Sequence, residues 1–151
     1  MSSRRTIALA LAAVALLLAG MSLAATPTPA GLWRTIDDET HKERSLVRIT
    51  EVNGELRGAV EKIFDQPGDD PSHICKECKG DRKDKPIVGM TILWGLRRDG
   101  DEWTGGEILD PKNGKTYRCK MKLSPDGKSL DVRGYVGLSL LGRTQTWLRA
   151  Q

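Results

Sequence analysis

The chain has 151 residues and a net charge of +4, with 38% hydrophobic and 29% charged residues. This length suits one domain and leaves little room for two. Two of the basic residues, Arg4 and Arg5, lie in an N-terminal segment, and without them the net charge falls to +2. A nearly neutral chain lacks the basic surface of a nucleic-acid-binding protein, so we expect no nucleic-acid partner.

Residues 1–25 have the composition of a secretory signal peptide. Two arginines precede an apolar run from Ile7 to Ala19, and the small residues of Ser22–Ala25 follow it. These are the charged, apolar and cleavage regions of an export signal. The run is short for a membrane span, and no second apolar stretch follows it. We therefore expect export to the periplasm or outside the cell, and a mature chain 26–151 without a transmembrane span.

The mature chain has the composition of an all-β protein. Only three alanines remain after residue 25, and four turn pairs (Asn53-Gly54, Asp99-Gly100, Asn113-Gly114, Asp126-Gly127) separate strand-like runs. Such pairs favour tight hairpins. The pattern predicts about eight antiparallel strands, near residues 31–36, 44–51, 55–64, 87–97, 102–109, 115–123, 129–137 and 141–149.

Alternating residues predict that each strand has one buried and one solvated face. Tyr117, Cys119 and Met121 alternate with Arg118 and Lys120, and Leu130 and Val132 repeat the pattern. Neighbouring antiparallel strands must protect two outer edges, and closure into a barrel removes both. We therefore predict an all-β, up-and-down barrel, whose interior is either filled by side chains or holds one small ligand.

Residues at the two ends of the strand series are candidates for closing the barrel. Gly31 and Trp33 open the first strand, while Arg143, Trp147 and Arg149 belong to the last. In lipocalin-like barrels a Gly-x-Trp packs against an arginine from the final strand and plugs one end. An indole is a large apolar stopper, and a guanidinium can stack on its face.

Three further segments carry a family resemblance. They are Trp103 to Tyr117 (WTGGEILDPKNGKTY), Leu130 to Gly137 (LDVRGYVG) and Gly142 to Trp147 (GRTQTW). From Gly31 to Arg149 the chain resembles a bacterial secreted family catalogued as domain of unknown function 2147, and within it a subset with a Cys-x-x-Cys loop. The resemblance implies a small exported lipocalin-like barrel and no particular activity.

One segment interrupts the regular spacing of the strands. Residues 65–86 are rich in proline and charge and contain Cys75 and Cys78. A long connection in a compact domain is usually functional or mobile, and we place this one over or beside the barrel mouth. Export favours a disulfide between the two cysteines. A redox pair and a metal site with His73 remain alternatives, whereas haem attachment is rejected because residue 79 is Lys rather than His.

Two further features of the sequence have both a structural and a functional interpretation. Cys119 lies on an apolar face, where a free cysteine behaves as a core residue; it could also reach a ligand or pair with the loop. The row of Arg118, Lys120, Lys122 and Arg133 suits a solvated outer face and could also attract an anionic partner.

Function follows from this architecture by analogy. The leading hypothesis is a non-enzymatic protein that binds a small apolar or amphipathic molecule, with no cofactor. Its candidate ligand-binding residues lie on the predicted inner face: Trp103, Tyr117, Met121, Leu130 and Val132. The alternative is a solid barrel that contacts an envelope partner through its charged loop or cationic face. A thiol redox, metal-binding or enzymatic role is the weakest hypothesis, because no catalytic arrangement stands out.

Overall fold

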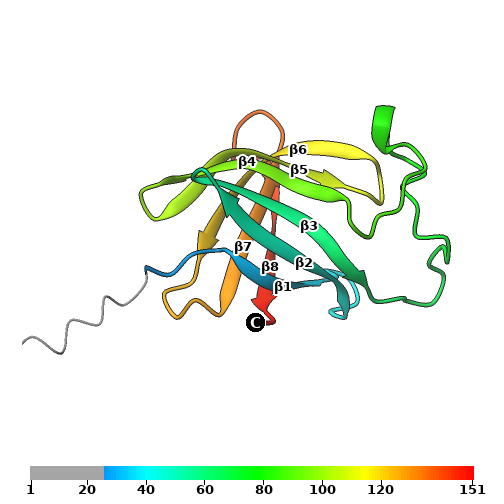
Figure 1. Cartoon of the computed structure of the whole chain (residues 1–151), viewed down its shortest axis with the longest axis horizontal. Helices are drawn as coiled ribbons and strands as arrows, with labels where there is room; N and C mark the ends of the chain where they lie inside the picture. The colour runs from blue at the N-terminus through cyan, green and yellow to red at the C-terminus, as the bar shows by residue number, and fades with distance from the viewer. Residues whose placement is uncertain (1–25) are drawn as a thin grey trace, which may run out of the picture.

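The computed structural model of the protein describes residues 26–151, and the predicted signal peptide, residues 1–25, lies outside them. Eight strands form a closed barrel in which each strand pairs antiparallel with its neighbours in the chain (Figure 1). The strands are β1 (Gly31–Ile36), β2 (Glu43–Val52), β3 (Glu55–Ile63), β4 (Thr91–Asp99), β5 (Glu102–Asp110), β6 (Lys115–Leu123), β7 (Ser129–Tyr135) and β8 (Gly142–Arg149). The predicted all-β barrel is therefore confirmed.

Alternation places one face of each strand inside the barrel. In β6, Cys119 and Met121 are buried while Arg118 and Lys122 are exposed, as the pleat of a strand requires. The core runs along the barrel axis and includes Trp33, Ile49, Leu56, Leu93, Leu96, Met121, Leu130 and Trp147.

The up-and-down topology gives the barrel two different ends. The turns β2–β3, β4–β5 and β6–β7 and both ends of the described chain lie at one end, which we call the plugged end. The connections β1–β2, β3–β4, β5–β6 and β7–β8 lie at the other, which we call the loop end.

Arg149 and Trp33 close the plugged end. The guanidinium of Arg149 lies over the Trp33 ring, 4.3 Å from its centroid, and donates hydrogen bonds to the backbone carbonyls of Gly127, Ala30 and Thr28. Gly31 has a φ of 141°, which residues with a side chain rarely adopt, and a Cβ there would stand 2.5 Å from Arg149 Nη1, so glycine suits the position where the arginine crosses β1. Burial lowers the pKa of Arg149, which remains charged at neutral pH.

Arg143 does not take part in this closure. It lies six residues before Arg149 in β8, roughly 20 Å along an extended strand. There it forms an ion pair with Asp38, in the β1–β2 loop at the opposite end of the barrel. The sequence places both arginines in the last strand but does not show which one meets Trp33.

The long connection between β3 and β4 extends beside the loop end, on the right in Figure 1. It contains one short 3-10 helix, η1 (Gly80–Arg82), and a two-residue bridge between Ile74 and Pro86. The strand predicted from residue 87 begins only at Thr91, because the chain turns at Ile87–Met90, where Met90 N–H donates to the Ile87 carbonyl.

We predict that Arg149→Met lowers the free energy of unfolding by about 2–4 kcal/mol, because three backbone carbonyls lose a charged donor and Trp33 loses its stacking partner. Urea titration followed by tryptophan fluorescence measures the change. The control is Arg57→Met, which removes an exposed arginine paired with Glu55. Equal unfolding midpoints for the two variants would show that Arg149 does not support closure.

Candidate functional site

A cavity of about 550 Å³ opens at the loop end. Its apolar lining comes from strands on opposite sides of the barrel and includes Ile92, Ile108, Leu109, Val132 and Trp147. Trp147 and Val132 are almost fully buried, so they form the floor. The volume lies within the range of small-molecule sites, roughly 300–1,000 Å³.

The cavity lies where the seam between the first and last strands opens. β1 pairs with β8 only at Trp33–Arg149 and Arg34–Leu148, near the plugged end. Beyond those pairs, Thr35 of β1 and Gln145 of β8 both line the cavity. Side chains bridge the gap instead of backbone, since Gln145 Nε2 lies 3.5 Å from Asp38 Oδ2. Incomplete pairing of the seam therefore makes the opening.

Uncharged polar groups lie around the apolar floor. Thr35 Oγ1 and Ser45 Oγ share a hydrogen bond of 2.8 Å, and Thr35 is buried. Across the mouth, Asn113 Nδ2 donates to the Tyr117 hydroxyl at 3.1 Å. These groups can hydrogen-bond a neutral ligand without the cost of burying a charge.

Charged side chains occupy the rim, and most of them have partners. Arg44 bonds Asp69 at 2.7 Å, which lowers the pKa of Asp69. The backbone N–H of Thr40 donates to Asp37 and lowers the pKa of that carboxyl too. Three basic and four acidic side chains line the cavity, so neither sign dominates: Arg44, Lys112 and Arg143 against Asp37, Asp38, Glu39 and Asp110.

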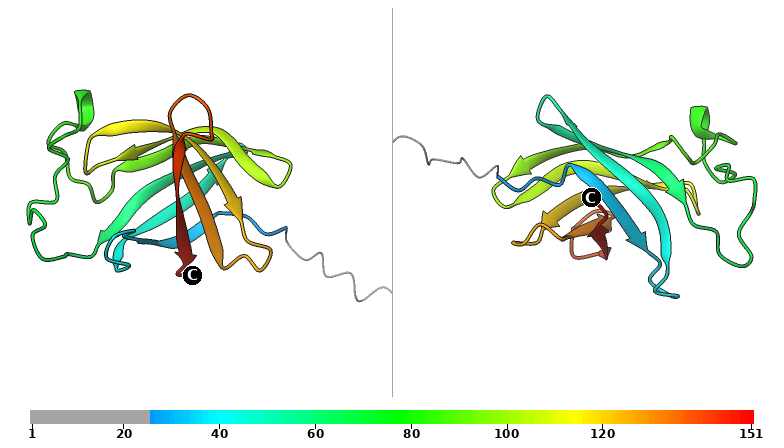
Figure 2. Two further views of the ribbon diagram at one scale, coloured as in Figure 1. Left: turned by 180° about the vertical axis from the view of Figure 1, so that it is seen from behind. Right: turned by 60° about the horizontal axis from the view of Figure 1, so that its bottom comes forward.

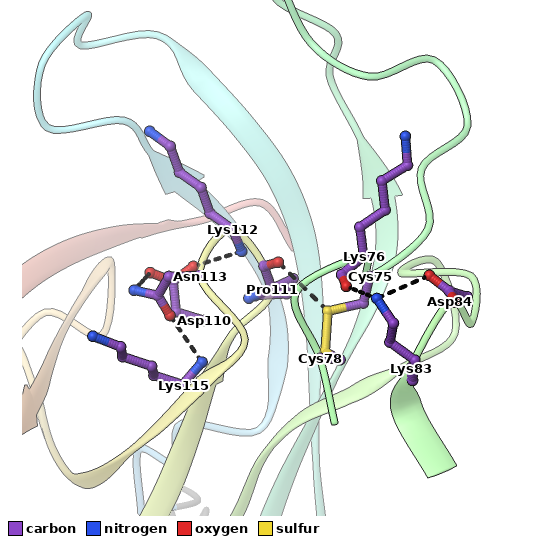
Figure 3. The surroundings of a disulfide bond; sticks show 10 residues. All are labelled: Cys75, Lys76, Cys78, Lys83, Asp84, Asp110, Pro111, Lys112, Asn113 and Lys115. Atoms are coloured by element: carbon purple, nitrogen blue, oxygen red, sulfur yellow. Dashed lines mark hydrogen bonds and ion pairs between the residues drawn. A yellow bond between two sulfur atoms is a disulfide. The ribbon is translucent and has the colours of Figure 1, made fainter. Parts of the chain in front are cut away.

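Beside the cavity, the β3–β4 connection packs against the β5–β6 turn (Figure 3). Cys75 and Cys78 form a disulfide, and Cys75 Sγ lies 3.4 Å from the carbonyl oxygen of Pro111. Gly114 allows the contact, because a Cβ there would clash with the backbone of Glu77. The connection therefore braces the β5–β6 turn, and none of residues 65–86 lines the cavity. The cavity therefore does not lie beneath this connection.

Comparison with protein families matches residues 31–149 to a family described as "Uncharacterized protein conserved in bacteria (DUF2147)". The protein belongs to this family. The resemblance inferred from the sequence is thereby confirmed, and the matched range coincides with the barrel from β1 to β8.

A solved structure shares the DUF2147 barrel fold. It is described as "Protein HP1028 from the human pathogen Helicobacter pylori belongs to the lipocalin family", and matches with a TM-score of 0.71 and 22% sequence identity over 83% of this chain and 85% of that one. This similarity shows the lipocalin-like fold. No curated protein sequence matches the chain. Within residues 26–151, no helix has the length and apolar character needed to cross a membrane.

The DUF2147 barrel separates the five candidate ligand-binding residues into two groups. Tyr117 and Val132 line the cavity. Trp103, Met121 and Leu130 are buried in the packed core toward the plugged end. Met121 lies four residues beyond Tyr117 in β6, roughly 13 Å further from the mouth. Alternation identifies which residues face the barrel interior. It does not show where along the barrel axis side chains fill that interior and where they leave a cavity.

Several cavity residues were not predicted from the sequence. Thr35 and Ser45 lie on the inner faces of their strands but are polar, so the alternation of apolar residues did not identify them as lining residues. Trp147 was expected in the closure and instead lies on the cavity floor. Leu141 was predicted as the first residue of the strand 141–149, but β8 begins at Gly142 and Leu141 lies in the preceding loop, where it lines the cavity. A signal for Thr35 and Ser45 was available, because both occupy the inward register of otherwise apolar strands.

Two of the three cysteines form a disulfide, and the third is a buried free thiol. Because Cys75 and Cys78 are joined in a disulfide, they offer no thiolates, and the metal site considered with His73 is wrong in this oxidised state. His73 instead bonds Asp65 at 2.5 Å, and residues 26–151 contain no cluster of potential ligands suited to a metal ion. Cys119 is buried and unpaired, and burial raises the pKa of its thiol to about 12, so it stays protonated and packs as a core residue.

Ion pairs and hydrogen bonds engage much of the cationic outer face. Lys120 bonds Glu102 at 3.2 Å, and Lys122 bonds Asp101 at 2.9 Å. Arg133 donates to backbone carbonyls of the β7–β8 loop. Arg118 is the member of the row that is exposed and for which no ion pair is found within residues 26–151. The face therefore suits a solvated surface more than a strong anion site.

We predict that Gly114→Ala displaces the disulfide segment from the β5–β6 turn, because the new Cβ meets the Glu77 backbone. Dithiothreitol should then reduce the Cys75–Cys78 bond at least tenfold faster, as measured by mass spectrometry after thiol alkylation. Gly127→Ala is the matched control, since Gly127 has the same left-handed backbone (φ 70° against 67°) with nothing near its Cβ. Equal reduction rates in both variants would contradict the brace.

Proposed function

We propose that this protein binds a small, uncharged, apolar or amphipathic molecule in the cavity at the loop end of its barrel. The observation that carries the proposal is the cavity itself: about 550 Å³, with an apolar floor that includes Trp147 and Val132 and uncharged polar groups above it. An apolar pocket with a few polar groups in fixed positions is the usual form of a small-molecule site.

The chemistry of the lining favours a neutral ligand. The buried polar pair, Thr35 and Ser45, is uncharged, and the arginines at the rim are each bonded to an aspartate. A charged ligand group would have to break one of those pairs, stay in water, or pair with Lys112 or Glu39, which are solvent-exposed at the edge of the mouth. A neutral hydroxyl or carbonyl group, by contrast, can bond Thr35, Ser45 or Tyr117 with the rim unchanged.

We assign ligand binding, and not catalysis, to the cavity. We also propose that the protein is exported to the periplasm or outside the cell. The lining contains neither histidine nor cysteine within the described residues, so the Ser–His and Cys–His nucleophile–base pairs have no residues to form them there. The location rests on the signal-peptide pattern of residues 1–25, and the disulfide fits an oxidising compartment.

An envelope partner held by the charged loop or by the cationic face is the less favoured alternative. Within the loop, Lys76 pairs with Asp70 and Lys83 with Asp84, and the lysines of the cationic face are paired as well. Charges already paired contribute less to binding a partner, because the existing pair must be broken first.

We predict that Ile108→Trp weakens binding of the neutral fluorescent probe N-phenyl-1-naphthylamine at least tenfold, because the larger side chain occupies the cavity that Ile108 lines. Fluorescence titration measures the affinity. The control is Val52→Trp, which makes a similar change at an exposed position in β2 outside the cavity. Equal affinities for both variants, or no binding by the unaltered protein, would contradict a ligand site in this cavity.

A further inference from the structure

The β7–β8 connection carries the most apolar exposed surface of the described chain. We call residues 136–141 the leucine loop. Figures 1 and 2 show it, in orange, projecting from the barrel wall and set apart from the long green connection. Four of its side chains are large, apolar and more than half exposed: Val136 66%, Leu138 71%, Leu140 85% and Leu141 72%. Contiguous exposed apolar groups of this kind mark a contact surface.

The backbone of the leucine loop is held in place, so its leucines are presented by the fold. Arg133 Nε donates to the Ser139 carbonyl at 2.6 Å, and its Nη2 donates to the Leu140 carbonyl at 3.2 Å. The third nitrogen of the guanidinium bonds Thr144 of β8 at 2.8 Å. One arginine therefore satisfies the polar groups at the loop tip while the apolar side chains stay in solvent.

The leucine loop is continuous with the cavity. Val136 and Leu141 line the cavity as well as being exposed outside it. Apolar surface therefore runs from the outer tip, over the rim and down to the floor at Val132. An apolar molecule moving along this path does not have to cross a ring of charges.

The shape and charge of this end of the molecule fit a lipid surface. A projecting loop of six residues is small beside a stable protein interface, which buries about 800 Å² on each partner. A few leucines are enough to enter the boundary between headgroups and acyl chains, where affinity grows with the buried apolar area. The balanced charges of the cavity rim give no preference for an anionic surface.

We propose that the leucine loop inserts into a lipid layer, and that the cavity exchanges its ligand with that layer across Val136 and Leu141. The first statement stands on the loop alone. The second rests on the function proposed for the cavity and specifies where its ligand comes from: an uncharged apolar molecule dissolved in lipid.

Flotation with phosphatidylcholine vesicles tests the contact. We expect the unaltered protein to float with the vesicles and the double variant Leu138→Ser, Leu140→Ser to lose at least tenfold in the bound fraction. The matched control, Val52→Ser with Leu148→Ser, removes two exposed apolar side chains outside the loop and should float like the unaltered protein. All four side chains are solvent-exposed, so folding is expected to persist and is checked by circular dichroism.

Three results would overturn the lipid contact: no flotation of the unaltered protein, equal flotation of the loop and control variants, or flotation only with vesicles that contain phosphatidylglycerol. The last would indicate attraction by charge. Size-exclusion chromatography with light scattering tests whether a second copy of the chain, instead of lipid, contacts the leucine loop. A dimer that the loop variant converts to a monomer would show that a second copy of the chain covers the leucines.

Transfer of N-phenyl-1-naphthylamine separates the contact from the cavity function. The loop variant should keep its affinity for probe added from solution and take up probe from loaded vesicles at least tenfold more slowly than the control variant. Equal transfer rates would overturn the exchange route. Flotation of a protein that binds no probe from solution would reject the cavity function and leave the lipid contact standing.

Discussion

The rest of the structure depends on a seam of two residue pairs. The ladder between β1 and β8 has only the pairs Trp33–Arg149 and Arg34–Leu148, whereas the ladder between β2 and β3 has eight pairs. So short a seam leaves most of the closure to side chains, and Arg149 supplies it by stacking on Trp33 and bonding three carbonyls of the plugged end. The same shortness leaves Thr35 and Gln145 unpaired across the seam, which opens the cavity. The short pairing of β1 with β8 therefore has two results: side chains close the plugged end, and the cavity opens at the loop end.

The architecture could be predicted from the sequence because its signals are local. Alternation in residues such as Cys119 and Met121 defines a strand face, and Asn-Gly and Asp-Gly pairs define the hairpins, so strand number and order follow. The start of β4 could not be predicted in the same way. Residues 87–90 have strand-like composition, but the turn at Gly89 (φ 87°) depends on a hydrogen bond to Val60 of β3, a contact distant in sequence.

The cavity was less accessible to sequence reasoning, because depth along a barrel is a property of packing. Tyr117 and Met121 lie on the same face of β6, yet Tyr117 lines the cavity and Met121 is buried in the packed core. The difference is made by the large side chains that fill the plugged half, including Trp33 from β1 and Leu56 from β3. The alternation of residues in one strand does not show how much of the barrel interior is filled by side chains from the other seven strands.

The long charged connection supports the mouth without covering it. Its disulfide segment sits on Pro111 and Gly114, and Arg82 stacks on Trp94 of β4, 4.6 Å from the ring centroid. The ion pair between Asp69 and Arg44 holds the start of the connection to β2, so its contacts lie on the β2 to β6 side of the barrel, away from β7 and β8. The leucine loop is then left as the apolar part of the rim. The mouth therefore has the charged connection along its β2 to β6 side and the exposed apolar side chains of residues 136–141 beside β7 and β8.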